Sequence, residues 1–130
     1  MASIFTKIIN GEIPCYKIAE NENFLAFLDV FPLVQGHVLV IPKKEIDYIF
    51  DIGDTDLAEM IVFAKNVAIA LKSAITCKRI GVAVIGLEVP HAHIHLVPMS
   101  TTGDINFTQP KLEPSSDELA LIAEKIRSKF

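Results

Sequence analysis

The sequence predicts an α+β fold, in which an antiparallel β-sheet of about five strands carries a long central helix and a C-terminal helix. Apolar runs of strand length dominate the middle of the chain, and two segments with helical periodicity lie between and after them. Because helices and strands do not alternate regularly, the order favours an antiparallel sheet. With 130 residues, of which 51% are hydrophobic, we expect one domain spanning residues 1–130.

A short helical turn and several strands are expected ahead of the long helix and directly after it. Residues 4–10 have the pattern of a helical turn, which Gly11 closes. The loop of residues 30–36 is marked by Pro32 and Gly36. Four segments have the length and apolar content of strands: residues 16–19, 23–29, 37–42 and 80–85.

Two longer helices follow from apolar residues at three- and four-residue spacing. The stripe of the first consists of Leu57, Met60, Ile61, Ala64, Val67, Ala68 and Leu71. Asp56 and Glu59 suit its N-terminus, and Ser115 and Glu118 form a capping-box pattern for the second helix. The apolar residues of that helix are Leu119, Ile122 and Ile126. Residues 100–114 lie between the last strand and this helix and have little regular pattern.

Three of the four histidines, His91, His93 and His95, alternate with apolar residues in a segment that Pro98 is expected to end. Alternation is typical of a strand, so residues 91–97 are predicted to project all three imidazoles from one face, about 6.6 Å apart. The alternative without a functional site is that these are ordinary exposed or hydrogen-bonded strand histidines. Three histidines on one face are, however, hard to explain by packing. The cluster indicates a site for an anion, a metal or a proton transfer.

Zinc is a second interpretation of the histidine cluster. Histidines two residues apart can place two imidazoles on one ion, and catalytic zinc can use three histidines. In a regular strand, however, His95 lies about 13 Å from His91, so one ion does not easily collect all three. We therefore expect no metal and no other cofactor.

Other side chains near the predicted strand ends are candidates for the same site. His37 begins a strand that the sheet could bring beside the cluster, and Asp29 ends the preceding strand. Loop aspartates most often form Asx turns, which composition favours over a role in binding ribose hydroxyls. Several apolar residues belong to the core by default but could line a slot for a base: Ile4, Phe5, Ile8, Phe27 and Leu28.

Composition narrows the classes of partner. A net charge of −4 without a basic tract argues against nucleic acid. No run of 18 apolar residues occurs, so no membrane partner is expected, and the first residues lack the apolar stretch of a signal peptide. We expect a cytoplasmic protein in which Cys15 and Cys77 are free thiols. Neither of the glycine-rich phosphate-binding motifs occurs.

Three blocks of the sequence, taken in order, carry a resemblance to a known family. They are residues 4–14, residues 25–32 with 36–43, and the segment His91-Ala92-His93-Ile94-His95-Leu96-Val97, which has the pattern His-x-His-x-His-x-x. The pattern matches the signature of the histidine triad (HIT) family of nucleotide hydrolases and transferases, and the first two blocks are similar to the opening and the central block of its Hint-like branch. Together these blocks cover most of residues 3–98 in the expected order.

The resemblance implies hydrolysis of purine nucleoside 5′-phosphoramidates or related nucleotides at the α-phosphate. His93 would attack phosphorus to form a nucleotidyl-histidine, and water would then release the nucleoside monophosphate. The carbonyl of His91 would fix the tautomer of His93, His95 and His37 would bind phosphate oxygens, and Asp29 would bind ribose. The wall of the base pocket would consist of Ile4, Phe5, Ile8, Phe27 and Leu28. A homodimer, with two sheets joined across a two-fold axis, is also implied.

One region departs from the family pattern. Gly86-Leu87-Glu88-Val89 stands where the family usually has Gly-Gln-(Ser/Thr)-Val. Leu87 cannot donate a hydrogen bond, and an ionised Glu88 would repel an anionic leaving group but favour a cationic amine. We therefore expect phosphoramidates to be preferred over dinucleoside polyphosphates, unless backbone amides or the segment near Asn106 replace the missing contacts. The alternatives are a dinucleoside polyphosphate hydrolase and a nucleotide-binding or interaction protein with weak or lost catalysis.

Overall fold

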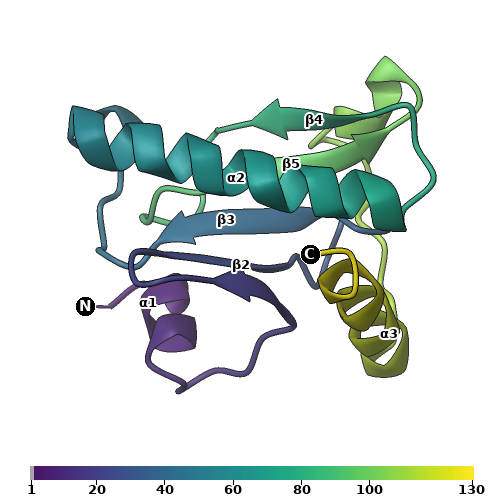
Figure 1. Cartoon of the computed structure of the whole chain (residues 1–130), viewed down its shortest axis with the longest axis horizontal. Helices are drawn as coiled ribbons and strands as arrows, with labels where there is room; N and C mark the ends of the chain where they lie inside the picture. Colours follow the sequence, from purple (N-terminus) through teal and green to yellow (C-terminus); the bar gives the residue numbers. More distant parts are fainter. Residues whose placement is uncertain (1) are drawn as a thin grey trace.

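A computed structural model describes residues 2–130, and its central element is a five-stranded antiparallel sheet (Figure 1). The strands are ordered β1-β2-β3-β5-β4, and every neighbouring pair is antiparallel. The elements are α1 (Ile4–Ile9), β1 (Lys17–Glu20), β2 (Phe24–Leu28), β3 (Val38–Pro42), α2 (Asp54–Ala74), β4 (Arg79–Ala83), β5 (Ile94–Met99) and α3 (Ser116–Arg127). Short 3₁₀ helices are η1 (Ile49–Asp51) and η2 (Thr102–Ile105). The predicted α+β class, with its long central helix and C-terminal helix, is confirmed.

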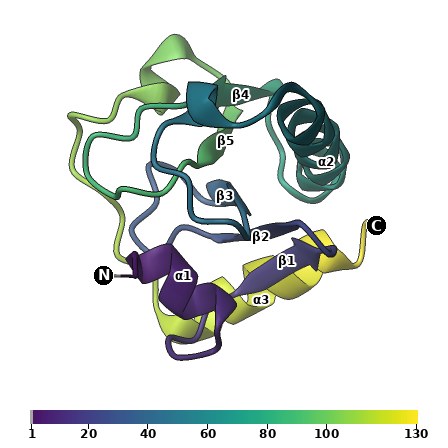
Figure 2. The ribbon, with the colours of Figure 1, turned by 90° about the vertical axis from the view of Figure 1, so that its left-hand side faces the viewer.

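The two faces of the sheet bury different sets of side chains. Alternate residues of β2, such as Leu28, enter the large core formed with α2 and α3. The intervening residues, such as Phe27, pack in a smaller cluster with Phe5 of α1. Figure 2 shows α2 and α1 on opposite sides of the sheet. Because Leu39 pairs with His95 across β3 and β5, His95 lies on the α1 side.

The strand that carries the histidines differs from the predicted one at both ends. It begins at Ile94, so His91 and His93 precede it, and it continues through Pro98 to Met99. Proline is tolerated at this position because β3 pairs with β5 only as far as Leu96, which leaves one side of β5 without a strand. The prediction that Pro98 ends the strand was therefore wrong.

The two long helices begin differently, since α3 has a side-chain cap and α2 has none. Helix α2 begins at Asp54, slightly before the predicted start at Asp56. Helix α3 has the predicted cap, since the Ser115 hydroxyl accepts the backbone N–H of Glu118 at 3.1 Å. Within residues 2–130, no helix combines the length and the apolar character needed to cross a membrane.

Candidate active site

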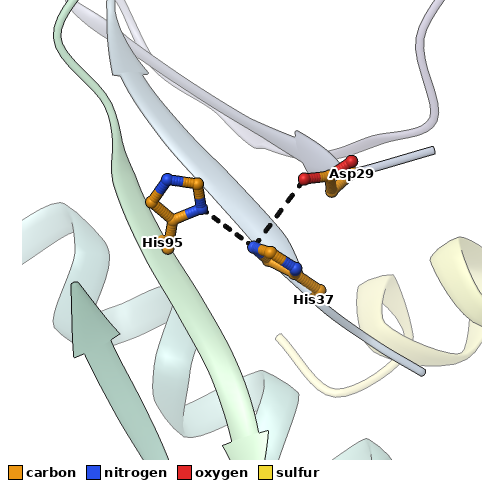
Figure 3. Close-up of side chains that lie close together, drawn as sticks. All are labelled: Asp29, His37 and His95. Atoms are coloured by element: carbon orange, nitrogen blue, oxygen red, sulfur yellow. Dashed lines mark hydrogen bonds and ion pairs between the residues drawn. The ribbon is translucent and has the colours of Figure 1, made fainter. Parts of the chain in front are cut away.

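Three imidazoles lie in a row along the α1 side of the sheet. His37 immediately precedes β3, His95 lies in β5, and His93 lies immediately before β5. The ring centroids are 5.2 Å apart for His37 and His95 and 4.8 Å apart for His95 and His93. All three side chains are buried. Figure 3 shows His37 between His95 and Asp29, the residue that directly follows β2.

A chain of hydrogen bonds fixes the tautomers of His37 and His95. The backbone N–H of Leu33 donates to Nδ1 of His37 at 3.1 Å, so the ring proton of neutral His37 is on Nε2. This Nε2–H donates to Nδ1 of His95 at 2.9 Å. His95 therefore carries its own proton on Nε2, where it can donate to a bound oxyanion.

His93 has the opposite tautomer. Its Nδ1 lies 2.8 Å from the carbonyl oxygen of His91, and a carbonyl only accepts hydrogen bonds. The proton of neutral His93 is consequently on Nδ1, and Nε2 retains its lone pair. A nucleophile and a proton donor thus stand side by side on His93 and His95, a combination suited to nucleophilic displacement at phosphorus.

The ring of His91 also packs against Phe5 of α1, with ring centroids 5.7 Å apart, so the three imidazoles lie on one side of the sheet as predicted. Only His95 of the three lies within a strand, however, and the ring of His91 is not part of the row. His91 precedes β5, where strand alternation does not apply. Its Nε2 donates to the carbonyl of Pro42 at 2.8 Å, and its Nδ1 lies 2.8 Å from the hydroxyl of Ser3, which therefore donates to it. Both nitrogens are engaged, and the ring is fully buried.

Burial determines the charge state of the paired imidazoles. Desolvation is the main cause that lowers the pKa of His37 to about 4, and the charges of Lys111 and His93 lower it further. Desolvation likewise lowers the pKa of His95 to about 3, with contributions from His37, His93 and Lys111. Both rings are neutral at pH 7, so they act on a phosphate through N–H dipoles rather than through full charges.

Asp29 has the turn role that composition favours and also faces the histidines. Its Oδ1 accepts the backbone N–H of Phe31 at 2.9 Å, which is an Asx turn. Its Oδ2 lies 3.8 Å from Nε2 of His37. Burial is the main cause that raises the pKa of the Asp29 carboxyl. The carboxylate is thus partly withdrawn from water at the edge of the histidine row.

Asp29, His37 and His95 also have the spacing of metal ligands, with one potential ligand atom from each lying within 4.8 Å of the others. The hydrogen bond from Leu33 argues against this use. A metal on Nε2 of His37 would require the ring proton on Nδ1, where it would oppose the backbone N–H of Leu33. The tautomers that these hydrogen bonds imply therefore suit an anion better than a cation.

An apolar wall borders the histidine row on the side of α1. Phe5 packs edge-to-face against Phe27 and His93, with ring centroids 5.6 and 5.1 Å away, and Ile8 packs on the same cluster. Ile4 begins the same helix and is 50% exposed. Leu28 does not face this wall, because it alternates with Phe27 and enters the core on the opposite face of the sheet.

Leu87 and Glu88 are both exposed on the connection between β4 and β5. The side chain of Leu87 is 88% exposed. Glu88 is close enough for its charge to raise the pKa of Asp29. At the two positions where the family usually has Gln and Ser or Thr, this chain therefore brings the carboxylate of Glu88 near the site and offers no side-chain hydrogen-bond donor.

Sequence reasoning missed two residues that follow β5. The ring of Phe107 packs edge-to-face on His95, with centroids 4.7 Å apart, and Lys111 lies against Phe107. The available signal was an aromatic residue and a lysine within an otherwise polar segment. Ser3 was missed as well, although a serine directly before a helical pattern is a common capping signal.

Comparisons with known proteins identify the family of this chain. The family model described as the HIT domain matches residues 10–102. An uncharacterised HIT-like protein of Mycoplasma genitalium is 43% identical over 77% of this chain and 74% of its own. An adenosine 5′-monophosphoramidase of Schizosaccharomyces pombe is 33% identical over 100% of this chain and 99% of its own.

Solved structures show the same relationship. The crystal structure of a Hit-like protein from Bartonella henselae has a TM-score of 0.86 and 29% sequence identity, over 98% of this chain and 96% of that one. The two proteins therefore share one fold over nearly the whole length of both chains. On the family match, the full-length relative and the arrangement of its histidines, this chain belongs to the histidine triad (HIT) family.

Proposed function

We propose that this protein is a nucleotide hydrolase that cleaves purine nucleoside 5′-phosphoramidates at the α-phosphorus. The observation that carries the proposal is the 2.8 Å hydrogen bond between Nδ1 of His93 and the carbonyl of His91, which leaves a lone pair on Nε2. The full-length similarity to an adenosine 5′-monophosphoramidase supports the substrate class.

The reaction has two displacements at phosphorus. In the first, Nε2 of His93 forms a bond to the α-phosphorus while the phosphorus–nitrogen bond to the leaving group breaks, and the amine departs with a proton from solvent. In the second, water attacks the nucleotidyl-histidine, loses a proton to solvent and releases the nucleoside monophosphate and His93. The Nε2–H of His95 donates to a phosphate oxygen in both steps, and His37 orients His95.

Binding of the nucleoside is assigned to the groups at either side of the histidine row. Asp29, which lies 3.8 Å from His37, would accept hydrogen bonds from the ribose hydroxyls. The wall of Phe5, Ile8 and Phe27 would contact the base. An aromatic and aliphatic wall contacts any purine, which is why the base is assigned only as a purine.

The leaving group is assigned from charge. Glu88 is exposed and within electrostatic range of Asp29, so an anionic leaving group would approach two carboxylates. An amine would not meet this repulsion. We therefore expect a higher kcat/KM for adenosine 5′-phosphoramidate than for a dinucleoside polyphosphate, and near-equal values would refute this assignment.

A homodimer is part of the proposal. Strand β4 is an edge strand, and its Val82 is 57% exposed, with Val84 and Ile85 also exposed directly after it. An exposed apolar edge is suited to pairing with a second chain. Size-exclusion chromatography with light scattering measures the mass of the protein in solution. The mass of a monomer at micromolar concentration would contradict the proposed homodimer.

The test of the reaction is release of AMP from adenosine 5′-phosphoramidate by wild type and by His93→Ala, with EDTA present. We expect turnover in the wild type and a loss of at least about a thousandfold in the variant, since removing a nucleophile abolishes the covalent route. Intact-mass measurement on a quenched wild-type reaction should detect a protein carrying one nucleotidyl group.

Calorimetric binding of AMP serves as the control for folding of His93→Ala. A variant that binds AMP but does not turn over supports a nucleophilic role for His93. If the wild type itself releases no AMP while still binding it, the protein belongs to the class of nucleotide-binding proteins with lost catalysis. If His93→Ala retains the wild-type rate, the proposed mechanism is wrong.

A further inference from the structure

The segment between β5 and α3 is held against the histidine row. Phe107 packs on His95 at 4.7 Å and lies 6.3 Å from His37, measured between ring centroids. The backbone N–H of Leu112 donates to the carbonyl of Pro32, in the loop that leads into His37, at 2.9 Å. The path of this segment is therefore fixed on both sides of residue 111.

The ammonium group of Lys111 has a defined position within this segment. Its Nζ donates to the carbonyl of Phe107 at 2.8 Å and lies 5.9 Å from the centroid of the same ring. Its other contact is a longer hydrogen bond of 3.4 Å to the carbonyl of Gln109. Within residues 2–130, no carboxylate lies within 4.0 Å of Lys111, so its charge is not neutralised by an ion pair.

The ammonium group of Lys111 brings positive charge to a site whose other charged groups are negative. His37 and His95 are neutral at pH 7, while Asp29 and Glu88 bring negative charge that opposes a nucleotide phosphate. In the part of the chain that the structure describes, Lys111 is the lysine or arginine whose charge acts on Asp29, His37 and His95 together. Lys111 is exposed, and it lies beside Phe107, whose ring packs on His95, so its charge is next to the histidine row.

We propose that Lys111 binds the phosphate of the nucleotide, and so supplies from the segment after β5 a contact that Leu87 and Glu88 cannot make. The inference rests on the proposed function, since it takes the nucleotide phosphate to lie against His95. Lys111 is an exposed, flexible side chain, and rotation away from the carbonyl of Phe107 frees its donors for a phosphate oxygen.

The test compares a ligand that has a phosphate with one that lacks it. Calorimetry measures the Kd of AMP and of adenosine for wild type, Lys111→Gln and Lys111→Arg. We expect Lys111→Gln to raise the Kd of AMP roughly fivefold and to leave the Kd of adenosine unchanged. A change of this size corresponds to an exposed ion pair near the upper end of its usual strength. Lys111→Arg should retain most of the AMP affinity. Increasing salt should narrow the difference between wild type and Lys111→Gln.

Lys65→Gln is the matched control, because it makes the same change in net charge on α2, which covers the other face of the sheet. An equal loss of AMP affinity in Lys65→Gln would reduce the effect to net charge and overturn the proposal. If Lys111→Gln raised the Kd of AMP and that of adenosine equally, the segment would have a structural role and the proposal would be wrong. An unchanged Kd of AMP in Lys111→Gln would also overturn the proposal. Failure of the wild type to bind AMP at all would instead contradict the proposed function.

Discussion

Acidification should destabilise this protein well above the pH at which its carboxylates titrate. The largest cause is the pair His37 and His95, which are neutral and buried in the folded chain but free to take up protons when it unfolds. Because burial lowers their folded pKa values to about 4 and about 3, these two groups bind more protons in the unfolded chain at every pH from about 6.5 down to those values. Their contribution to stability is therefore fully present above pH 6.5 and is lost as the pH falls. Burial lowers the pKa of His91 in the same direction, whereas the raised pKa of Asp29 acts in the opposite direction.

The size of this effect follows from the shifts. Each imidazole has an ordinary pKa of 6.5, and the linkage relation gives about 1.4 kcal/mol per pH unit for a group protonated only in the unfolded state. Between pH 7 and pH 5 each of the two groups therefore costs about 2 kcal/mol, and together they cost about 4 kcal/mol. The lowered carboxyl pKa values of Glu20 and Glu45, both about 2, add little above pH 5 because those groups are ionised in both states.

The assay is urea denaturation at pH 7 and pH 5, at one protein concentration so that self-association does not enter the comparison. The quantity compared is the change in free energy of unfolding between the two pH values within each protein. We expect His37→Asn or His95→Asn to reduce this change by about 2 kcal/mol and the double variant to reduce it by about 4 kcal/mol, while the contribution of His91 remains. A wild-type change below about 1 kcal/mol, or an undiminished change in the double variant, would refute the reasoning.

Two further predictions concern stability. Gly36→Ala should cost about 2–4 kcal/mol by thermal denaturation, because Gly36 has a φ of +89° and an added Cβ would lie 2.9 Å from Cγ1 of Ile75. Gly11→Ala is the control, since its φ is +79° but an added Cβ would meet nothing within 4 Å, and an equal cost in both would rule out the clash. Ser3→Ala should cost about 1–3 kcal/mol in urea denaturation, because it removes the cap of α1 and leaves Nδ1 of buried His91 without its 2.8 Å partner. An unchanged midpoint would contradict that role.

The sequence predicted the elements that have a strong apolar pattern. Strands β2 and β3 are continuous apolar runs because both faces of the sheet are covered and every residue is buried, and α2 follows from its helical stripe. For His91 and His93 the alternation predicted a strand that the structure does not have there, because a period of two in the sequence does not require strand geometry. Those two residues lie in the connection before β5, where hydrogen bonds to Pro42 and to each other set the ring positions.

The rest of the site depends on contacts between distant segments. The proximity of Asp29 and His37 follows from the pairing of Leu28 with Val38, a register that the two strand ends suggest but do not fix. The positions of Phe107 and Lys111 depend on the path of a segment with no periodic pattern. That path is held by the packing of Phe107 on His95 and by the backbone hydrogen bond from Leu112 to the carbonyl of Pro32, neither of which a local pattern predicts.

The tautomers of the site are set by the backbone. A backbone N–H from Leu33 and the carbonyls of His91 and Pro42 each decide where an imidazole proton resides. Every residue offers such groups, so the sequence cannot reveal which of them will serve. Because these groups are held by the fold, the lone pair on His93 and the N–H on His95 are oriented before any nucleotide binds. The cost of that orientation falls on folding rather than on the reaction, which is how a preorganised site lowers a barrier.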